Sequence, residues 1–155
     1  MAAQIIFGSG FEASTATLLA RVTGVDGEPI VQASLTTLSY EVWEIPVPLE
    51  YKNRDWQSLY LNPTIPTKIV SAVSLTIADV VFDTLQLDDR WADLDAIGYN
   101  LAVPLPDTTF PLGDLEDYPK GIWNEIPFKA VPAVGPSFRF SFKMLAKANN
   151  FGKTP

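Results

Sequence analysis

Short segments in which apolar and polar residues alternate, separated by turn and proline signals, constrain the fold of this chain most strongly. The clearest is 137–144, where Phe138, Phe140, Phe142 and Met144 alternate with small or charged residues. A period of two predicts a strand with one buried face. Residues 4–7 predict an edge strand or a detachable arm. Similar patterns predict strands at 15–23, 28–33, 38–45, 68–75 and 99–103.

About seven strands are expected, with one short helix, proline-rich crossings and long loops between them. Asp26-Gly27, between the first two of the longer segments, is a strong hairpin signal. The chain lacks the alternation of strands and long helices that builds a parallel α/β sheet. Its 155 residues, 47% of them hydrophobic, can fill one core. The sequence therefore predicts an all-β fold, an antiparallel sandwich of about seven strands.

One short helix is expected at about 76–86. Thr76 stands three residues before Asp79, as in a capping box. The apolar positions that follow have the spacing of one helix face. They are Ile77, Val80, Val81, Thr84 and Leu85.

We expect a single domain over residues 1–144, with 46–66 and 113–135 as long loop excursions and 145–155 as an extended basic tail. Within the second excursion, residues 123–131 could hold a strand interrupted at Pro127. Residues 139–155 carry four basic side chains and no acid, so the net charge of −7 leaves −7 − 4 = −11 on residues 1–138. Such an acidic body is unfavourable for binding nucleic acid.

The absence of two residue types excludes several kinds of chemistry. The chain contains no Cys and no His, which excludes disulfides, thiolate zinc sites, cysteine nucleophiles and Ser-His catalysis. The glycines form no phosphate-binding motif. We therefore expect no enzyme and no cofactor. No apolar run approaches the ~20 residues that span a bilayer, and no signal peptide pattern is present, so we expect a soluble protein made in the cytoplasm, without a membrane partner.

Four aspartates crowd one turn after the expected helix: Asp88, Asp89, Asp93 and Asp95. Calcium prefers several oxygen ligands from such loops, although the spacing does not match an EF-hand. The alternative is a solvated turn in which Asp93 or Asp95 accepts hydrogen bonds from nearby backbone amides. Trp91 and Tyr99 would then close the turn onto the sandwich.

The interface candidates are aromatic and basic side chains in the two excursions and the C-terminal region. Tyr, Trp and Arg are enriched at interface hot spots. The alternative is that the loop aromatics pin the loops to their own domain and that the tail is solvated. The candidates are Tyr51, Arg54, Trp56, Tyr60, Trp123, Lys143, Lys147, Phe151 and Lys153.

The string FDTLQ, then DDRW, the aspartate at position 95 and GYN resembles a family of small Ig-like virion-associated proteins. These are encoded among the head and tail morphogenesis genes of tailed phages and prophages. The resemblance is centred on residues 75–111. It implies an Ig-like sandwich with a structural role in a virion, and it carries over no catalytic residue.

On this resemblance we expect a capsid decoration or cement protein. It would stabilise the head through contacts with the major capsid protein, other virion proteins and neighbouring copies, as a homo-oligomer or multi-copy assembly located in the virion. One alternative is a neck, tail or baseplate component. A second is a carbohydrate-binding adhesin, which would need exposed aromatic platforms in 46–66 or 113–135.

Overall fold

The computed structural model describes residues 5–11, 15–45, 67–109 and 122–147. They form eight strands, one short α-helix, α2 (Ile77–Val80), and two 3₁₀ turns, η1 (Gln32–Ser34) and η3 (Asp107–Thr109). The strands, in chain order, are β1 (Ile5–Phe11), β2 (Ala16–Ala20), β3 (Leu35–Ile45), β4 (Thr67–Leu75), β5 (Val81–Gln86), β6 (Tyr99–Leu105), β7 (Ile122–Pro132) and β8 (Phe138–Lys147).

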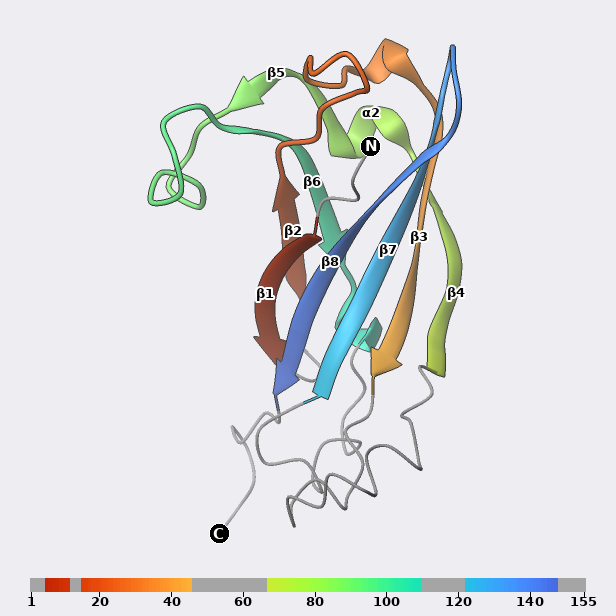
Figure 1. Cartoon of the computed structure of the whole chain (residues 1–155). Coiled ribbons are helices and arrows are strands. Elements are labelled where there is room, and N and C mark those ends of the chain that lie inside the picture. Colours follow the sequence, from red (N-terminus) through yellow and green to blue (C-terminus); the bar gives the residue numbers. More distant parts are fainter. Residues whose placement is uncertain (1–4, 12–14, 46–66, 110–121, 148–155) are drawn as a thin grey trace, which may run out of the picture.

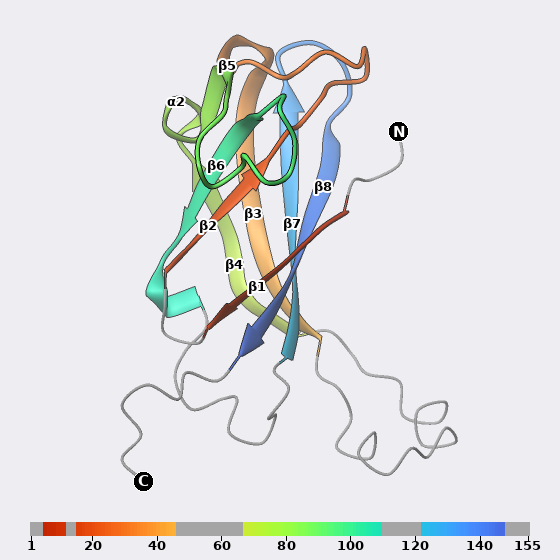
Figure 2. The same cartoon turned by 90° about the vertical axis from the view of Figure 1, so that its left-hand side faces the viewer.

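The strands form two sheets that face each other (Figures 1 and 2). One sheet has five strands in the order β1-β8-β7-β3-β4, and the other has three in the order β2-β6-β5. All neighbours are antiparallel except β1 and β8, which run parallel. This is the strand order of an Ig-type sandwich in which one additional strand, β4, extends the five-stranded sheet beside β3. The prediction of an all-β, Ig-like sandwich is confirmed.

The core lies between the two sheets, because alternate residues of each strand point inward. Its aromatic centre is Phe128, which stacks on Phe140 with ring centroids 5.0 Å apart and planes inclined by 7°. Phe142 meets the same ring edge-on at 5.5 Å. The alternation predicted for 137–144 therefore places its aromatic face in the core. The three-stranded sheet contributes Leu18, Ala20, Val81, Leu101, Val103 and Leu105.

The prediction of a helix over 76–86 is wrong beyond its first turn. The helix ends at Val80, and the next six residues form β5. Val81 pairs with Leu101 and Gln86 pairs with Tyr99 in β6. Because β-branched residues fit a half-buried pleated surface, the short apolar run forms a strand once a partner strand supplies its backbone hydrogen bonds. Short apolar runs of this kind do not distinguish helix from strand by spacing alone.

The prediction of a loop excursion over 113–135 is wrong for its second half. β7 lies between β8 and β3 in the five-stranded sheet. The strand expected within 123–131 is present, but Pro127 does not interrupt it: Pro127 pairs with Ser141 in β8. On the other side, β7 pairs with β3 at Phe128–Tyr40 and next at Glu125–Trp43. The strand thus tolerates a proline at a position where a missing N–H leaves the rest of the ladder intact. Residues 113–121 and the whole of 46–66 lie outside the described residues.

Both ends of the described chain are strands. Residues 145–147, predicted to begin the tail, continue β8, because β1 pairs with them: Ser9 with Leu145, Gly10 with Ala146 and Phe11 with Lys147. The segment at 4–7 is thus part of an edge strand, which is longer than predicted and continues to Phe11. The remainder of the tail, 148–155, lies outside the described residues.

The hairpin predicted at Asp26-Gly27 is present only as a tight turn. Gly27 has a φ of 82°, and the flanking residues meet in a single bridge between Thr23 and Pro29. The expected strand over 28–33 is absent from this described loop, which ends in η1 instead. Within the described parts of the chain, no helix has the length and apolar character needed to cross a membrane.

Candidate functional site

The acidic turn, residues 87–98, joins β5 to β6 and was the strongest chemical candidate in the sequence. Its first half is a helical turn without continuation: the amides of Trp91 and Ala92 both donate to the Asp88 carbonyl, at 2.9 Å each. Trp91 and Tyr99 are both buried, with ring centroids 5.6 Å apart. The two aromatics therefore close the turn onto the sandwich, as predicted.

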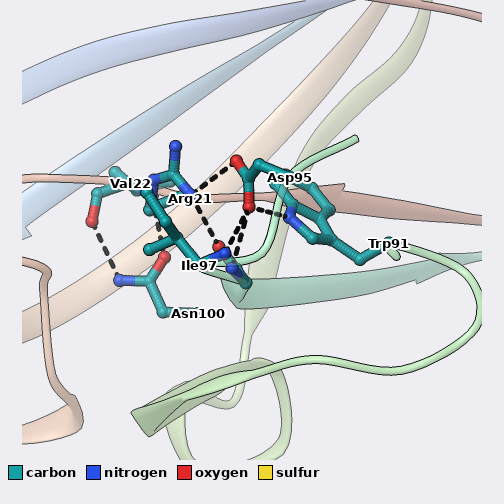
Figure 3. Close-up of polar contacts among 7 residues, drawn as sticks. Arg21, Val22, Trp91, Asp95, Ile97 and Asn100 are labelled. Atoms are coloured by element: carbon teal, nitrogen blue, oxygen red, sulfur yellow. Dashed lines mark hydrogen bonds and ion pairs between the residues drawn. The ribbon is translucent and has the colours of Figure 1, made fainter. Parts of the chain in front are cut away.

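The Asp95 carboxylate is the centre of one polar network (Figure 3). Arg21, which follows β2, donates to it at 2.7 Å, and the Trp91 indole donates at 2.8 Å. The backbone amides of Ile97 and Gly98 donate to the same carboxylate at 2.9 and 3.0 Å. These bonds, the Gly98 amide first, hold the pKa of the Asp95 carboxyl well below its usual range. The carboxylate thus fixes both the shape of the turn and its position against β2.

Asp88 is the centre of a second network. The Tyr99 hydroxyl donates to its carboxylate at 2.6 Å and Arg90 donates at 2.9 Å. The bond from Arg90, followed by that from Tyr99, lowers the pKa of Asp88 to about 2. Arg90 also donates to the Tyr99 hydroxyl at 2.8 Å, so the three side chains form a closed triangle. Burial, followed by the bond to Asp88, raises the pKa of Tyr99.

This geometry does not suit a calcium ion. The oxygens of Asp88 and Asp95 face N–H and O–H donors, and each carboxylate already has an arginine beside it. Asp89 and Asp93 are exposed on the surface of the turn. Among the residues that the structure describes, no three acidic side chains are grouped to hold a metal ion. The alternative prediction, that Asp95 accepts bonds from nearby amides, is confirmed.

Asn100, at the start of β6, is a third polar centre that sequence reasoning missed. It is 1% exposed, yet all its hydrogen-bonding groups are used. Its Oδ1 accepts from the Val22 amide at 2.7 Å, and its Nδ2 donates to the carbonyls of Val22 and Ile30 at 2.8 and 2.9 Å. The side chain joins β6 to both ends of the turn that follows β2. The signal in the sequence was a single polar residue in an otherwise apolar strand.

The outer face of the five-stranded sheet carries a small closed cluster. Glu41 accepts a 2.9 Å bond from the Trp43 indole and pairs with Lys68 at 3.4 Å. The Lys68 ammonium lies 5.1 Å from the centre of the Trp43 ring. The Trp43 bond is the largest cause of a lowered pKa for Glu41. The cluster joins β3 to the edge strand β4 and offers no reactive group.

The structure places three of the nine predicted interface residues. Trp123, near the start of β7, is 38% exposed and pairs with Ile45 on one side and Leu145 on the other. Lys143 stands opposite Glu125, and Lys147 is the last residue of β8. Trp123 and Lys143 are on the same face of the sheet, because Lys143 is two residues from Leu145, the partner of Trp123. The other six lie outside the described residues: Tyr51, Arg54, Trp56, Tyr60, Phe151 and Lys153.

Exposed large apolar side chains gather instead in two loop regions. Leu87, Leu94 and Ile97 lie on the acidic turn. Val25 and Val134 lie at the end of the sandwich, where the loop after β2 meets the turn between β7 and β8. Between the loop after β2 and the turn between β7 and β8 is a hollow of about 510 Å³ lined mainly by apolar residues. Exposed apolar groups around a concavity are typical of an interaction site.

Comparison with models of known protein families gave no match, and comparison with curated protein sequences gave none. Among solved structures, the fold is similar to the extracellular domains of the voltage-gated sodium channel beta4 subunit, described as parallel homodimers with a role in cell-cell adhesion. The identity is 6% and the TM-score 0.31, over 95% of this chain and 92% of that one. The Ig-like assignment therefore rests on the strand order and sheet pairing described above.

Proposed function

We propose that this chain is a non-enzymatic structural protein of a tailed-phage virion, most specifically a capsid decoration protein that acts through its interfaces. The proposal that the protein is not an enzyme is supported by the structural role of its main polar side chains. Asp88, Asp95 and Asn100 each hold one loop or strand to another, and each is fully engaged with protein donors or acceptors. Their geometry supports a rigid scaffold and provides no free acid or base in a cleft.

The surface supports a binding role. The acidic turn presents Leu87, Leu94 and Ile97 on a framework that the two carboxylate networks make rigid. A rigid loop loses little conformational entropy when it binds, so more of its contact energy appears as affinity. The free edge of β4 in the described part of the five-stranded sheet offers a second kind of contact, the addition of a strand.

The location in a virion is supported by the sequence resemblance around 75–111. The resemblance covers the acidic turn and its two flanking strands, and this segment contains Asp88, Asp95 and Asn100, the centres of the polar networks. A shell that contains pressurised DNA gains stability from proteins that bind several capsid subunits at once. Neck, tail and baseplate rings use the same kind of contact, so a ring component is the alternative within the virion.

Add-back to particles that lack the protein tests the proposal. Deletion of its coding sequence from the phage should give heads that release DNA at a lower temperature, and purified protein should bind those heads and restore the release temperature. Two variants with exposed sites, Leu94→Asp and Val134→Asp, show whether the acidic turn or the turn between β7 and β8 contacts the shell. If the purified protein does not bind the deficient heads, whether or not it binds tails, the decoration role is overturned.

A further inference from the structure

The hollow at the loop end of the sandwich has a fixed shape. One wall is the loop after β2 with η1, and the other is the turn between β7 and β8. The Ala133 amide donates to the Ser34 carbonyl at 2.9 Å, and Leu35 pairs with Pro132, so the two walls are held together. Ile30 and Leu35, 4% and 6% exposed, form its floor.

The rim of the hollow is apolar and acidic. Val25 and Val134, 75% and 92% exposed, stand on opposite walls. Among the described residues, the charged ones that line the hollow are Asp26 and Glu28, and neither forms an ion pair with another described residue. An apolar floor with an acidic rim is complementary to an apolar side chain flanked by basic ones.

The chain itself contains such a segment at its C-terminal end. Residues 147–155 place Phe151 between Lys147 and Lys153 and include no acid. Two other segments hold aromatic and basic residues, but both also contain acids: 46–66 has two and 110–121 has three. Charge complementarity with the rim therefore selects the C-terminal segment as the occupant.

The geometry of β8 prevents this contact within one molecule. Phe138, the first residue of β8, lines the hollow, and Lys147 is the last of its ten residues. A strand of that length spans about 30 Å, and Figure 1 shows the hollow's loops at one end of the sandwich and the end of β8 at the other. The four residues from Lys147 to Phe151 reach at most about 14 Å. Phe151 of the same chain cannot return to the hollow.

We propose that the hollow binds the C-terminal segment of a second copy of this chain, with Phe151 in the apolar floor and Lys147 and Lys153 facing Asp26 and Glu28. Because the two contacting surfaces differ, the contact is heterologous and arranges copies head to tail, in a ring or a filament. The proposal goes beyond the role in a virion, since self-association in solution does not depend on where the protein is located in a particle.

A peptide competition on the full chain tests the proposal. The mass of the full chain, measured by sedimentation equilibrium, should rise with concentration, and an excess of a peptide of residues 147–155 should return it to the monomer. The same peptide with Phe151→Ala should compete about tenfold less well or worse, because burial of an aromatic side chain is worth at least that factor. A full chain that is monomeric throughout, or an assembly that the peptide does not dissociate, would overturn the proposal.

A matched pair of surface variants tests the hollow itself. Val134→Asp adds a third acid to the rim at a side chain that packs against little, so the fold should persist, and direct binding of the labelled peptide should fall about tenfold. Leu94→Asp makes a similar change on the acidic turn, at a side chain 68% exposed, and should leave peptide binding unchanged. Equal effects of the two variants would show that the hollow is not the docking site. Neither result bears on whether the protein is present in a virion.

Discussion

The Asp95 carboxylate accepts a 2.7 Å hydrogen bond from Arg21, a residue 74 positions earlier in the chain. Through this pair, the turn between β5 and β6 is tied to the end of β2, and the backbone amides that bind the same carboxylate give the turn its shape. A side chain that the sequence presents as one of four clustered acids is thus a joint between distant segments.

The pair should make stability depend on pH in a defined direction. Because the pKa of Asp95 is held below its usual value in the folded state, the carboxylate contributes full stability above the unfolded pKa, about 3.9. That contribution is lost as pH falls toward the folded pKa. Asp95→Asn should therefore lower the melting temperature at pH 7, and the difference from the native chain should shrink between about pH 5 and pH 2. Asp88, whose pKa is about 2, loses its own contribution to stability over the same pH range, but it does so in both proteins and therefore cancels in the difference.

Thermal unfolding followed by circular dichroism from pH 2 to pH 7 checks this prediction. Asp93→Asn is the control, because Asp93 is exposed in the same turn and forms no hydrogen bond with another described residue. A constant difference between the native chain and Asp95→Asn across the whole range would contradict the assigned role of the carboxylate.

Asn100→Leu should be among the most destabilising single changes in the chain. Leucine is of similar size but leaves the Val22 amide and the Val22 and Ile30 carbonyls without their side-chain partner. Buried groups that lose their partner cost about 1–3 kcal/mol each, with some recovery by water, so we expect a loss of about 2–4 kcal/mol. Denaturant unfolding measures it. Gln86→Leu is the control, because the Gln86 amide bonds only to Thr84 in its own strand, and its cost should stay near 0.5 kcal/mol or less, roughly. Equal costs would mean that Asn100 does not join the segments.

Gly98→Ala and Gly135→Ala should differ, although both glycines have a positive φ, 107° and 101°. The left-handed backbone costs alanine about 1–2 kcal/mol at either position. At Gly98, a Cβ would also collide with the backbone carbonyl of Gln86, whereas at Gly135 nothing lies within 4 Å. The first variant should therefore lose a further 1–3 kcal/mol, roughly, as measured by denaturant unfolding. If both lose the same amount, the close approach of the turn to β5 has no energetic weight.

Calcium should not stabilise the protein. Since the oxygens of Asp88 and Asp95 face hydrogen-bond donors and a neighbouring arginine each, a calcium ion would have to displace those contacts. We expect the same melting temperature in millimolar calcium and in excess chelator, by differential scanning fluorimetry. A rise with calcium that saturates, and that Asp89→Asn with Asp93→Asn removes, would restore the calcium interpretation of the turn.

Most of the strands could be predicted, because one face of each is buried and the alternation follows. The predicted segments at 15–23, 38–45, 68–75, 99–103 and 137–144 correspond to β2, β3, β4, β6 and β8. β5 could not, because Val80 and Val81 fit both the spacing of a helix face and the composition of a strand. The full length of β7 could not be predicted, because Pro127 suggested an interruption. Whether a strand can include a proline depends on whether a neighbouring strand needs a hydrogen bond from that position, which the local sequence does not show.

The candidate site was predictable only where its contacts are local. The bonds from Ile97 and Gly98 to Asp95 span two and three residues, and such turns have a sequence signal. The contacts of Arg21 with Asp95 and of Asn100 with Val22 span 74 and 78 residues, and no single sequence reports which distant partners a polar residue will meet.

The most direct measurement is the number of copies of this chain in intact particles. Quantitative mass spectrometry of purified virions, with the major capsid protein as the internal standard, gives that number. The account predicts a fixed ratio to the major capsid protein, at a copy number that reflects the symmetry of the whole shell. Absence of the chain from purified particles would contradict a virion role, and a number that matches a single ring would assign it to the neck, tail or baseplate instead of the head.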